Sequence, residues 1–113
     1  MTASVFIAGP VSWNSIVVLD RLPEPVPHMQ FAEDSWETTG GTSAGKALSL
    51  TALGRPTLLY AVSAADEPGQ RVRGALDRAG VRTLWGEGDV TERHLNLMTC
   101  LLYTSDAADD SLR

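Results

Sequence analysis

A glycine-rich segment with hydroxyl side chains and a lysine is the part of this sequence best suited to bind a ligand. It contains Gly40, Gly41, Gly45 and Lys46 and leads into the apolar stretch 47–53. If that stretch is helical, its first turn offers unpaired backbone N–H groups and a partial positive charge. Glycines at such a point let a ligand approach the backbone closely. The segment therefore predicts a site for a polar or anionic small molecule.

The spacing of Gly40, Gly45 and Lys46 matches the first seven positions of a phosphate-binding P-loop. The eighth position of a P-loop is Ser or Thr, which holds magnesium, and here it is Ala47. A P-loop also follows a buried strand directly, whereas residues 34–39 are mostly polar. The P-loop is therefore the weaker interpretation, and it requires a buried strand that ends at Thr39.

Alternating strand and helix patterns must position this segment. The apolar, β-branched runs predict strands, and i, i+3, i+4 spacing predicts two helices, the second capped by Asp66. Strands are expected at residues 4–8, 16–19, 57–62 and 81–85, strands with one wet face within 28–39, and helices at 43–53 and 67–79. Three prolines exclude a helix from residues 21–27. The alternation predicts an α/β fold with a parallel sheet covered by helices.

Composition limits the class of protein. The 113 residues favour one domain, and the net charge of −5, with no basic cluster, argues against partners such as nucleic acid or a membrane surface. The single cysteine, Cys100, excludes an internal disulfide framework. No apolar run is long enough to span a membrane, and the first residues lack the basic start of a signal peptide. These features predict a cytoplasmic protein.

The end of the sequence differs from the rest. Residues 100–113 resemble translated sequencing-adapter read-through, and a genuine acidic tail or short helix is the alternative. The resemblance predicts that residues 1–99 are the authentic part, that 100–113 are an artefactual tail, and that the natural protein continues beyond Thr99.

Several segments, taken in order, resemble the N-terminal portion of the ribokinase-like (PfkB) carbohydrate kinases. They are residues 9–14, 19–23, 40–41 with the helix that ends at 52–54, 66–69 and 76–81. The resemblance covers about residues 4 to 99. It implies a doubly wound α/β sheet, of which this chain holds the N-terminal part. It also implies a small β-sheet lid over about residues 15–39, which could include residues 91–99.

The resemblance implies transfer of the ATP γ-phosphoryl group to a hydroxyl of a sugar or sugar-like alcohol, with Mg²⁺. Its sugar site would contain Ser12, Asn14, Gly40, Gly41 and Gly45. The catalytic Asp and the residues that bind ATP and Mg²⁺ belong to a C-terminal part of the family that is absent from this sequence. No catalytic or metal-binding residue is therefore expected here, the chain alone should be inactive, and the parent protein could be a homodimer through its lid.

Two positions depart from the family. Members often have Asp where this chain has Asn14, and usually Asn where it has Gly45. These changes leave the substrate open, because a site that reads hydroxyl groups rejects compounds that leave its polar groups unpaired. Lys46 could replace part of the lost contact and favour an anionic substrate, or it could be a solvated lysine. A small non-catalytic α/β ligand-binding module is the alternative function.

The remaining polar and aromatic side chains give weaker signals. His28 and His94 have no partner at ligand spacing, and Trp13 and Trp36 could stack on a sugar or pack within the protein. The sequence predicts that three arginines face solvent: Arg71, Arg73 and Arg78.

Overall fold

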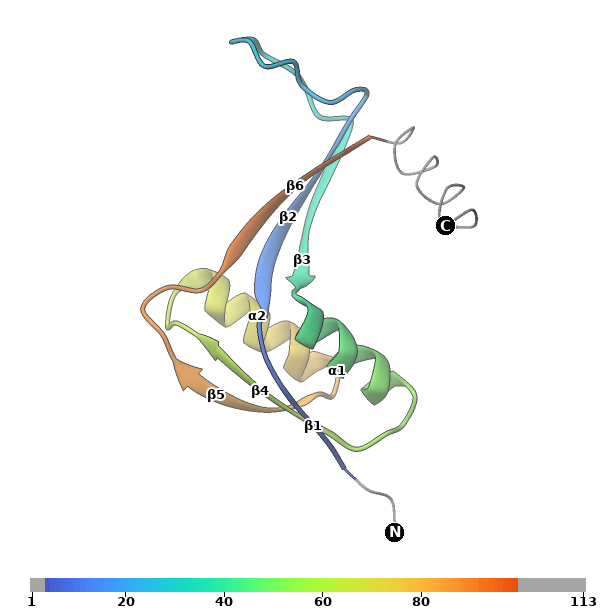
Figure 1. Ribbon diagram of the computed structural model, residues 1–113, viewed down its shortest axis with the longest axis vertical. Coiled ribbons are helices and arrows are strands. Elements are labelled where there is room, and N and C mark those ends of the chain that lie inside the picture. The colour runs from blue at the N-terminus through green and yellow to red at the C-terminus, as the bar shows by residue number, and fades with distance from the viewer. Residues whose placement is uncertain (1–3, 100–113) are drawn as a thin grey trace. The chain divides into compact units, whose positions relative to one another are not determined.

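A computed structural model of the chain describes residues 4–99. Six strands and two helices follow one another along the chain (Figure 1). They are β1 (Val5–Ala8), β2 (Ser12–Leu19), β3 (Asp34–Gly40), α1 (Thr42–Ala52), β4 (Thr57–Ser63), α2 (Glu67–Arg78), β5 (Arg82–Glu87) and β6 (Arg93–Thr99). The tail expected at 100–113, with Cys100, lies outside the described residues.

The described residues divide into two compact units. The first contains residues 4–14 and 38–94, and the second contains residues 15–37 and 95–99. The residue ranges of the second unit nearly match those expected for a lid, 15–39 and 91–99. Its action as a lid stays a prediction.

The first unit is built on a parallel sheet in the order β1-β4-β5. Val5 lies opposite Thr57, and Leu58 lies opposite Arg82. Both helices pack on one face of this sheet, because their buried side chains form a single core cluster with Leu59 and Ala61 of β4. The helical members of that cluster are Ala44, Ala47, Val72 and Leu76. Parallel strands joined by helices confirm the α/β class expected from the alternating pattern.

The opposite face of the sheet is exposed. Successive side chains of a strand point to opposite faces, so Val5 and Ile7 turn toward the helices while Phe6 turns away. Phe6, Val62 and Leu84 on this second face are 62%, 51% and 55% exposed. The strand expected at residues 4–8 is therefore present, and only one face of it is covered.

The helix boundaries agree with the sequence signals. Gly54 follows α1 with a φ of 81°, a left-handed conformation that favours glycine, and Pro56 prevents continuation. Asp66 caps α2 by accepting a hydrogen bond from Gly69 N at 2.9 Å. Neither helix in residues 4–99 has the length and hydropathy that crossing a membrane requires.

The second sheet has the order β3-β2-β6. Its central strand, β2, starts at Ser12 and not at Ile16: Trp13 N already donates to the Glu92 carbonyl at 2.9 Å, and the polar side chains of Ser12 and Asn14 are buried. Strand structure between residues 28 and 39 begins only at Asp34. Residues 20–33 contain neither helix nor strand, and Gln30 Nε2 links their ends by donating to Asp20 Oδ1 and the Arg21 carbonyl.

Candidate binding site at the start of the first helix

Ser12 and Asn14 form a buried polar pair at the start of β2. Ser12 Oγ donates a hydrogen bond of 2.6 Å to Asn14 Oδ1. A Cβ atom added at Gly40 would overlap the Asn14 side-chain amide, so only glycine leaves room for Asn14 at this position. The structure thus brings together three of the predicted site residues, from the start of β2 and the end of β3.

Gly41 packs against the loop that follows β1. Its φ is 97° and its ψ is 144°, a conformation that is almost confined to glycine, and an added Cβ would lie 2.6 Å from the Pro10 carbonyl oxygen. Gly41 is also the N-cap of α1, which has no side-chain cap and no acidic residue in its first turn. The first N–H groups of α1 therefore have no side-chain acceptor at the cap, which suits a polar or anionic ligand.

Gly45 and Lys46 lie on the exposed side of the first turns of α1, where Gly45 N donates to the Gly41 carbonyl oxygen at 3.0 Å. Both are exposed and line a shallow hollow of about 500 Å³ with Val5, Ile7, Ser49 and Leu50. An added Cβ at Gly45 would meet no atom within 4 Å. The structure does not gather these two residues with Ser12 and Asn14, and their part in substrate binding stays a prediction.

A second hollow lies beyond the carboxyl ends of β1 and β4. It has a volume of about 370 Å³, and Gly9, Pro10, Tyr60, Ala61 and Glu92 are among the residues that line it. Open parallel α/β sheets bind ligands beyond the carboxyl ends of their strands. The hollow is therefore a second place within the first unit that a ligand could occupy.

The structure does not support a P-loop. β3, which precedes the glycine segment, is exposed over residues 34–38 and belongs to the second sheet, so no buried parallel strand ends at Thr39. Ala47 at the Ser/Thr position is buried in the core. Residues 4–99 contain no group of three or more His, Cys, Asp or Glu side chains that could hold a metal ion. The glycine segment therefore lacks the features by which a P-loop holds ATP and Mg²⁺.

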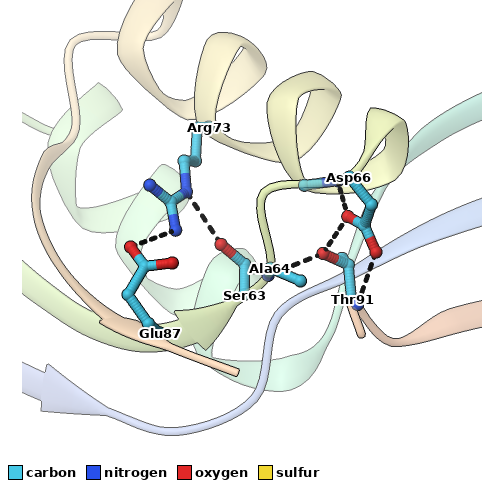
Figure 2. Close-up of polar contacts among 7 residues, drawn as sticks. Ser63, Ala64, Asp66, Arg73, Glu87 and Thr91 are labelled. Carbon is cyan, nitrogen blue, oxygen red and sulfur yellow. Dashed lines mark hydrogen bonds and ion pairs between the residues drawn. The ribbon is translucent and has the colours of Figure 1, made fainter. Parts of the chain in front are cut away.

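The helix cap Asp66 has a second set of partners that the sequence did not reveal (Figure 2). Thr91 N donates to Asp66 Oδ2 at 2.9 Å, and Thr91 Oγ1 donates to Asp66 Oδ1 at 2.6 Å. Ala64 N donates to Thr91 Oγ1 at 2.9 Å. The side-chain and backbone hydrogen bonds from Thr91 lower the pKa of Asp66 below its ordinary value of 3.8, because they stabilise the carboxylate. No local sequence signal links residues 25 positions apart.

Arg73 is only partly exposed, and its guanidinium has partners that the sequence did not reveal. Its Nε donates to Ser63 Oγ at 2.8 Å, and its Nη2 lies 3.3 Å from Glu87 Oε1 (Figure 2). Its guanidinium lies 4.9 Å from the centroid of the Trp85 ring. These partners come from the ends of β4 and β5, and their proximity depends on the parallel pairing of those strands. Arg71 and Arg78 are exposed, as expected.

The two tryptophans differ in exposure, and the two histidines each lie near a local partner. Trp13 is 8% exposed and belongs to the core cluster, whereas Trp36 in the second unit is 47% exposed. His28 Nδ1 lies 2.7 Å from the Val26 carbonyl oxygen, and His94 Nε2 lies 3.3 Å from Glu92 Oε2. Trp13 therefore serves packing, and each histidine has a local partner.

No protein-family model matches the chain, and no curated protein matches it significantly. Solved structures do match. A microbiome-derived acarbose kinase is 30% identical, with 88% of this chain and 34% of that chain covered at a TM-score of 0.79. A ribokinase from Cryptococcus neoformans in complex with ADP is 22% identical, with 88% and 32% covered at a TM-score of 0.73. Phosphofructokinase-2 from Escherichia coli in complex with fructose-6-phosphate is 15% identical, with 87% and 32% covered at a TM-score of 0.74.

The chain spans about a third of the length of each of these kinases. These matches cover 87–88% of this chain. The chain has the ribokinase-like α/β fold with a second, smaller sheet, and it resembles the N-terminal part of the carbohydrate kinases of that family.

Proposed function

We propose that this chain is the substrate-side part of an ATP-dependent carbohydrate kinase that phosphorylates a hydroxyl of a sugar or sugar-like alcohol. The observation that carries the proposal is the buried Ser12–Asn14 pair, held against Gly40 beside the uncapped N-terminus of α1. The ribokinase-like fold and the 30% identity to an acarbose kinase support the same reading.

The chemistry of the pair suits a neutral hydroxyl group. Asn14 Oδ1 accepts from Ser12 Oγ, which fixes the amide plane and turns Nδ2, a donor, toward Gly40. The N–H groups at the start of α1 add further donors. In this proposal the oxygens of a sugar accept hydrogen bonds from these donors, and a buried amide rejects compounds that leave it unpaired.

ATP, Mg²⁺ and the catalytic base would be held by residues outside this chain, as the family resemblance implies. Phosphoryl transfer depends on positioning and on charge stabilisation by metal ions and donors, which the resemblance assigns to the C-terminal part of the family. We therefore expect the 113-residue chain to bind a sugar weakly and to transfer no phosphoryl group.

Ligand-observed NMR tests the proposal on the chain itself. The probes are acarbose, a free pentose, a free hexose and a hexose phosphate, each with the native chain, Asn14→Ala and Asn96→Ala. Asn96 is an exposed asparagine of β6 and serves as the matched control. We expect a sugar signal that Asn14→Ala removes and Asn96→Ala preserves.

Sugar binding that is unchanged by Asn14→Ala would contradict the site. Phosphorylation of a sugar by the isolated chain with ATP would contradict the proposal that ATP, Mg²⁺ and the catalytic base are held by residues outside this chain. Tight, submicromolar binding would favour the non-catalytic binding module. Weaker binding of the hexose phosphate by Lys46→Met would support a role of Lys46 in binding an anionic substrate, and unchanged binding would support a solvated lysine.

We also propose that the complete kinase forms a homodimer through its second sheet unit. Large apolar side chains are exposed in that unit: Leu22, Val26, Met29, Phe31 and Trp36. Exposed apolar groups of this extent mark interaction surfaces. Sedimentation of Phe31→Ser and Leu53→Ser variants tests this, since Leu53 is equally exposed but lies in the first unit. Only Phe31→Ser should weaken self-association.

A further inference from the structure

The Asp66 carboxylate makes more contacts than a helix cap requires. It accepts three hydrogen bonds, from Gly69 N, Thr91 N and Thr91 Oγ1, at 2.9, 2.9 and 2.6 Å (Figure 2). Only the first of these belongs to α2. The other two come from the segment that connects β5 with β6, so Asp66 ties that segment to the start of α2.

Thr91 completes the connection. It is 2% exposed, and its hydroxyl accepts from Ala64 N at 2.9 Å while it donates to Asp66. The site is tight, because an added Cβ at Gly69 would overlap the Ala64 carbonyl oxygen. Thr91 is therefore fixed both to the end of β4 and to the start of α2.

Glu92, which follows Thr91, contacts the strand that holds the candidate binding site. The Glu92 carbonyl accepts a hydrogen bond from Trp13 N at 2.9 Å. Trp13 stands between Ser12 and Asn14 in β2. A continuous path of hydrogen bonds and one peptide unit thus runs from the Asp66 carboxylate through Thr91 and Glu92 to the backbone of the Ser12–Asn14 pair.

We infer that Asp66 is a positioning residue for the Ser12–Asn14 pair, acting through Thr91 and the Glu92 carbonyl. The role requires a carboxylate. Three donors converge on its two oxygens, and asparagine has a single acceptor oxygen. Asparagine is nevertheless as good an N-cap as aspartate. Asp66→Asn therefore separates the two roles, because a residue that only caps α2 would tolerate it.

The experiment is residue-resolved hydrogen exchange on the whole chain, with Trp13 N–H as the reporter and Leu59 N–H of β4 as the internal reference. The ratio of the two rates removes changes in global stability. We expect Asp66→Asn to speed exchange at Trp13 about tenfold or more relative to Leu59, as loss of a hydrogen bond to a charged group implies. Glu67→Gln, at the neighbouring exposed acid of the same turn, should leave the ratio unchanged.

Thr91 supplies a second pair of variants if Asp66→Asn fails to fold. Thr91→Val keeps the shape of the side chain and removes the hydroxyl, so it should raise the Trp13 ratio. Thr91→Ser restores the hydroxyl and should restore the native ratio. An unchanged ratio of the Trp13 and Leu59 exchange rates in both Asp66→Asn and Thr91→Val would overturn the inference. A ratio in Thr91→Ser as high as in Thr91→Val would also overturn it.

The inference rests on the proposed function only in treating Ser12 and Asn14 as sugar ligands. Exchange at Trp13 reports the connection without any ligand. If the ratio responds while Asn14→Ala leaves sugar binding unchanged, the connection stands and the proposed site fails. If Asn14→Ala removes binding while the ratio does not respond, the site stands and the positioning role fails.

Discussion

The two helices begin in contrasting ways. α1 starts at Gly41, with no side-chain cap and no acid in its first turn. α2 starts at Asp66, which caps it, followed by Glu67 and a proline. Both N-termini carry the same partial positive charge. At α2 the protein itself supplies the negative charge, and at α1 it supplies none.

This contrast suggests different roles: the N-terminus of α1 is a candidate binding site, and the N-terminus of α2 is a structural contact. At the start of α1, Gly40 leaves room for the Asn14 amide, and Gly41 lets the Pro10 carbonyl approach the helix closely. At α2, the Asp66 carboxylate accepts three hydrogen bonds from the protein and holds two segments of the chain together. A helix N-terminus is thus a candidate ligand site only where the chain leaves it uncapped, and the following substitutions test that distinction.

Gly41→Ala should have the largest effect. Its backbone conformation is almost confined to glycine, and the new Cβ would press on the Pro10 carbonyl oxygen. We expect the free energy of unfolding, measured with urea, to fall by about 3 kcal/mol. Gly54→Ala is the matched control, because Gly54 also has a positive φ but an added Cβ meets nothing. It should cost only about 1 kcal/mol, and equal losses would show that the contact with Pro10 is unimportant.

The carboxylate at α2 should make stability depend on acid. The folded pKa of Asp66 is lowered, so its contribution is present above 3.8 and is lost as pH falls through the lower folded value. We expect the difference in unfolding free energy between the native chain and Asp66→Asn to be constant near neutral pH and to shrink below 3.8. Urea melts at several pH values measure it. A difference that stays constant down to pH values well below 3.8 would show that the carboxylate is not preferentially ionised in the folded state.

Gly40→Ala should have a moderate effect beside α1. Its Cβ would overlap the Asn14 amide, which must turn away, and we expect a loss of about 1–2 kcal/mol. In a double-mutant cycle, Asn14→Ala should make the substitution at Gly40 much less harmful. Additive losses would indicate that Gly40 does not shape the Asn14 site.

Gly45→Ala should have the smallest effect, and the opposite sign. The position is helical and open, so alanine should raise the unfolding free energy by about 0.5–1 kcal/mol. Gly74→Ala in α2 is the counterpart, since the nearest atoms belong to the flexible end of Arg78. A loss of stability at Gly45 alone would mean that the first turns of α1 are more constrained than the structure indicates.

Local chemistry in the sequence was enough to predict much of the fold. The cap at Asp66, the terminating Gly54 and the apolar periodicity of the helices act over a few residues, and the structure confirms them. Long-range contacts could not be read in this way. The start of β2 is held by the bond from Trp13 N to the distant Glu92 carbonyl, and the partners of Asp66 and Arg73 meet only after strands pair. The grouping of Ser12, Asn14, Gly40 and Gly41, and the separate place of Gly45 and Lys46, likewise depend on tertiary contacts.

The register of the parallel sheet bears on the order in which the chain folds. β4 and β5 are joined by α2 alone, whereas β1 pairs with β4 only after α1 and the intervening residues 9–56 have been enclosed. Closing a longer loop costs more chain entropy, so the β4–α2–β5 portion should form the folding nucleus and β1 should dock late. Conservative truncations at Leu59 should then slow folding, while those at Ile7 should mainly speed unfolding.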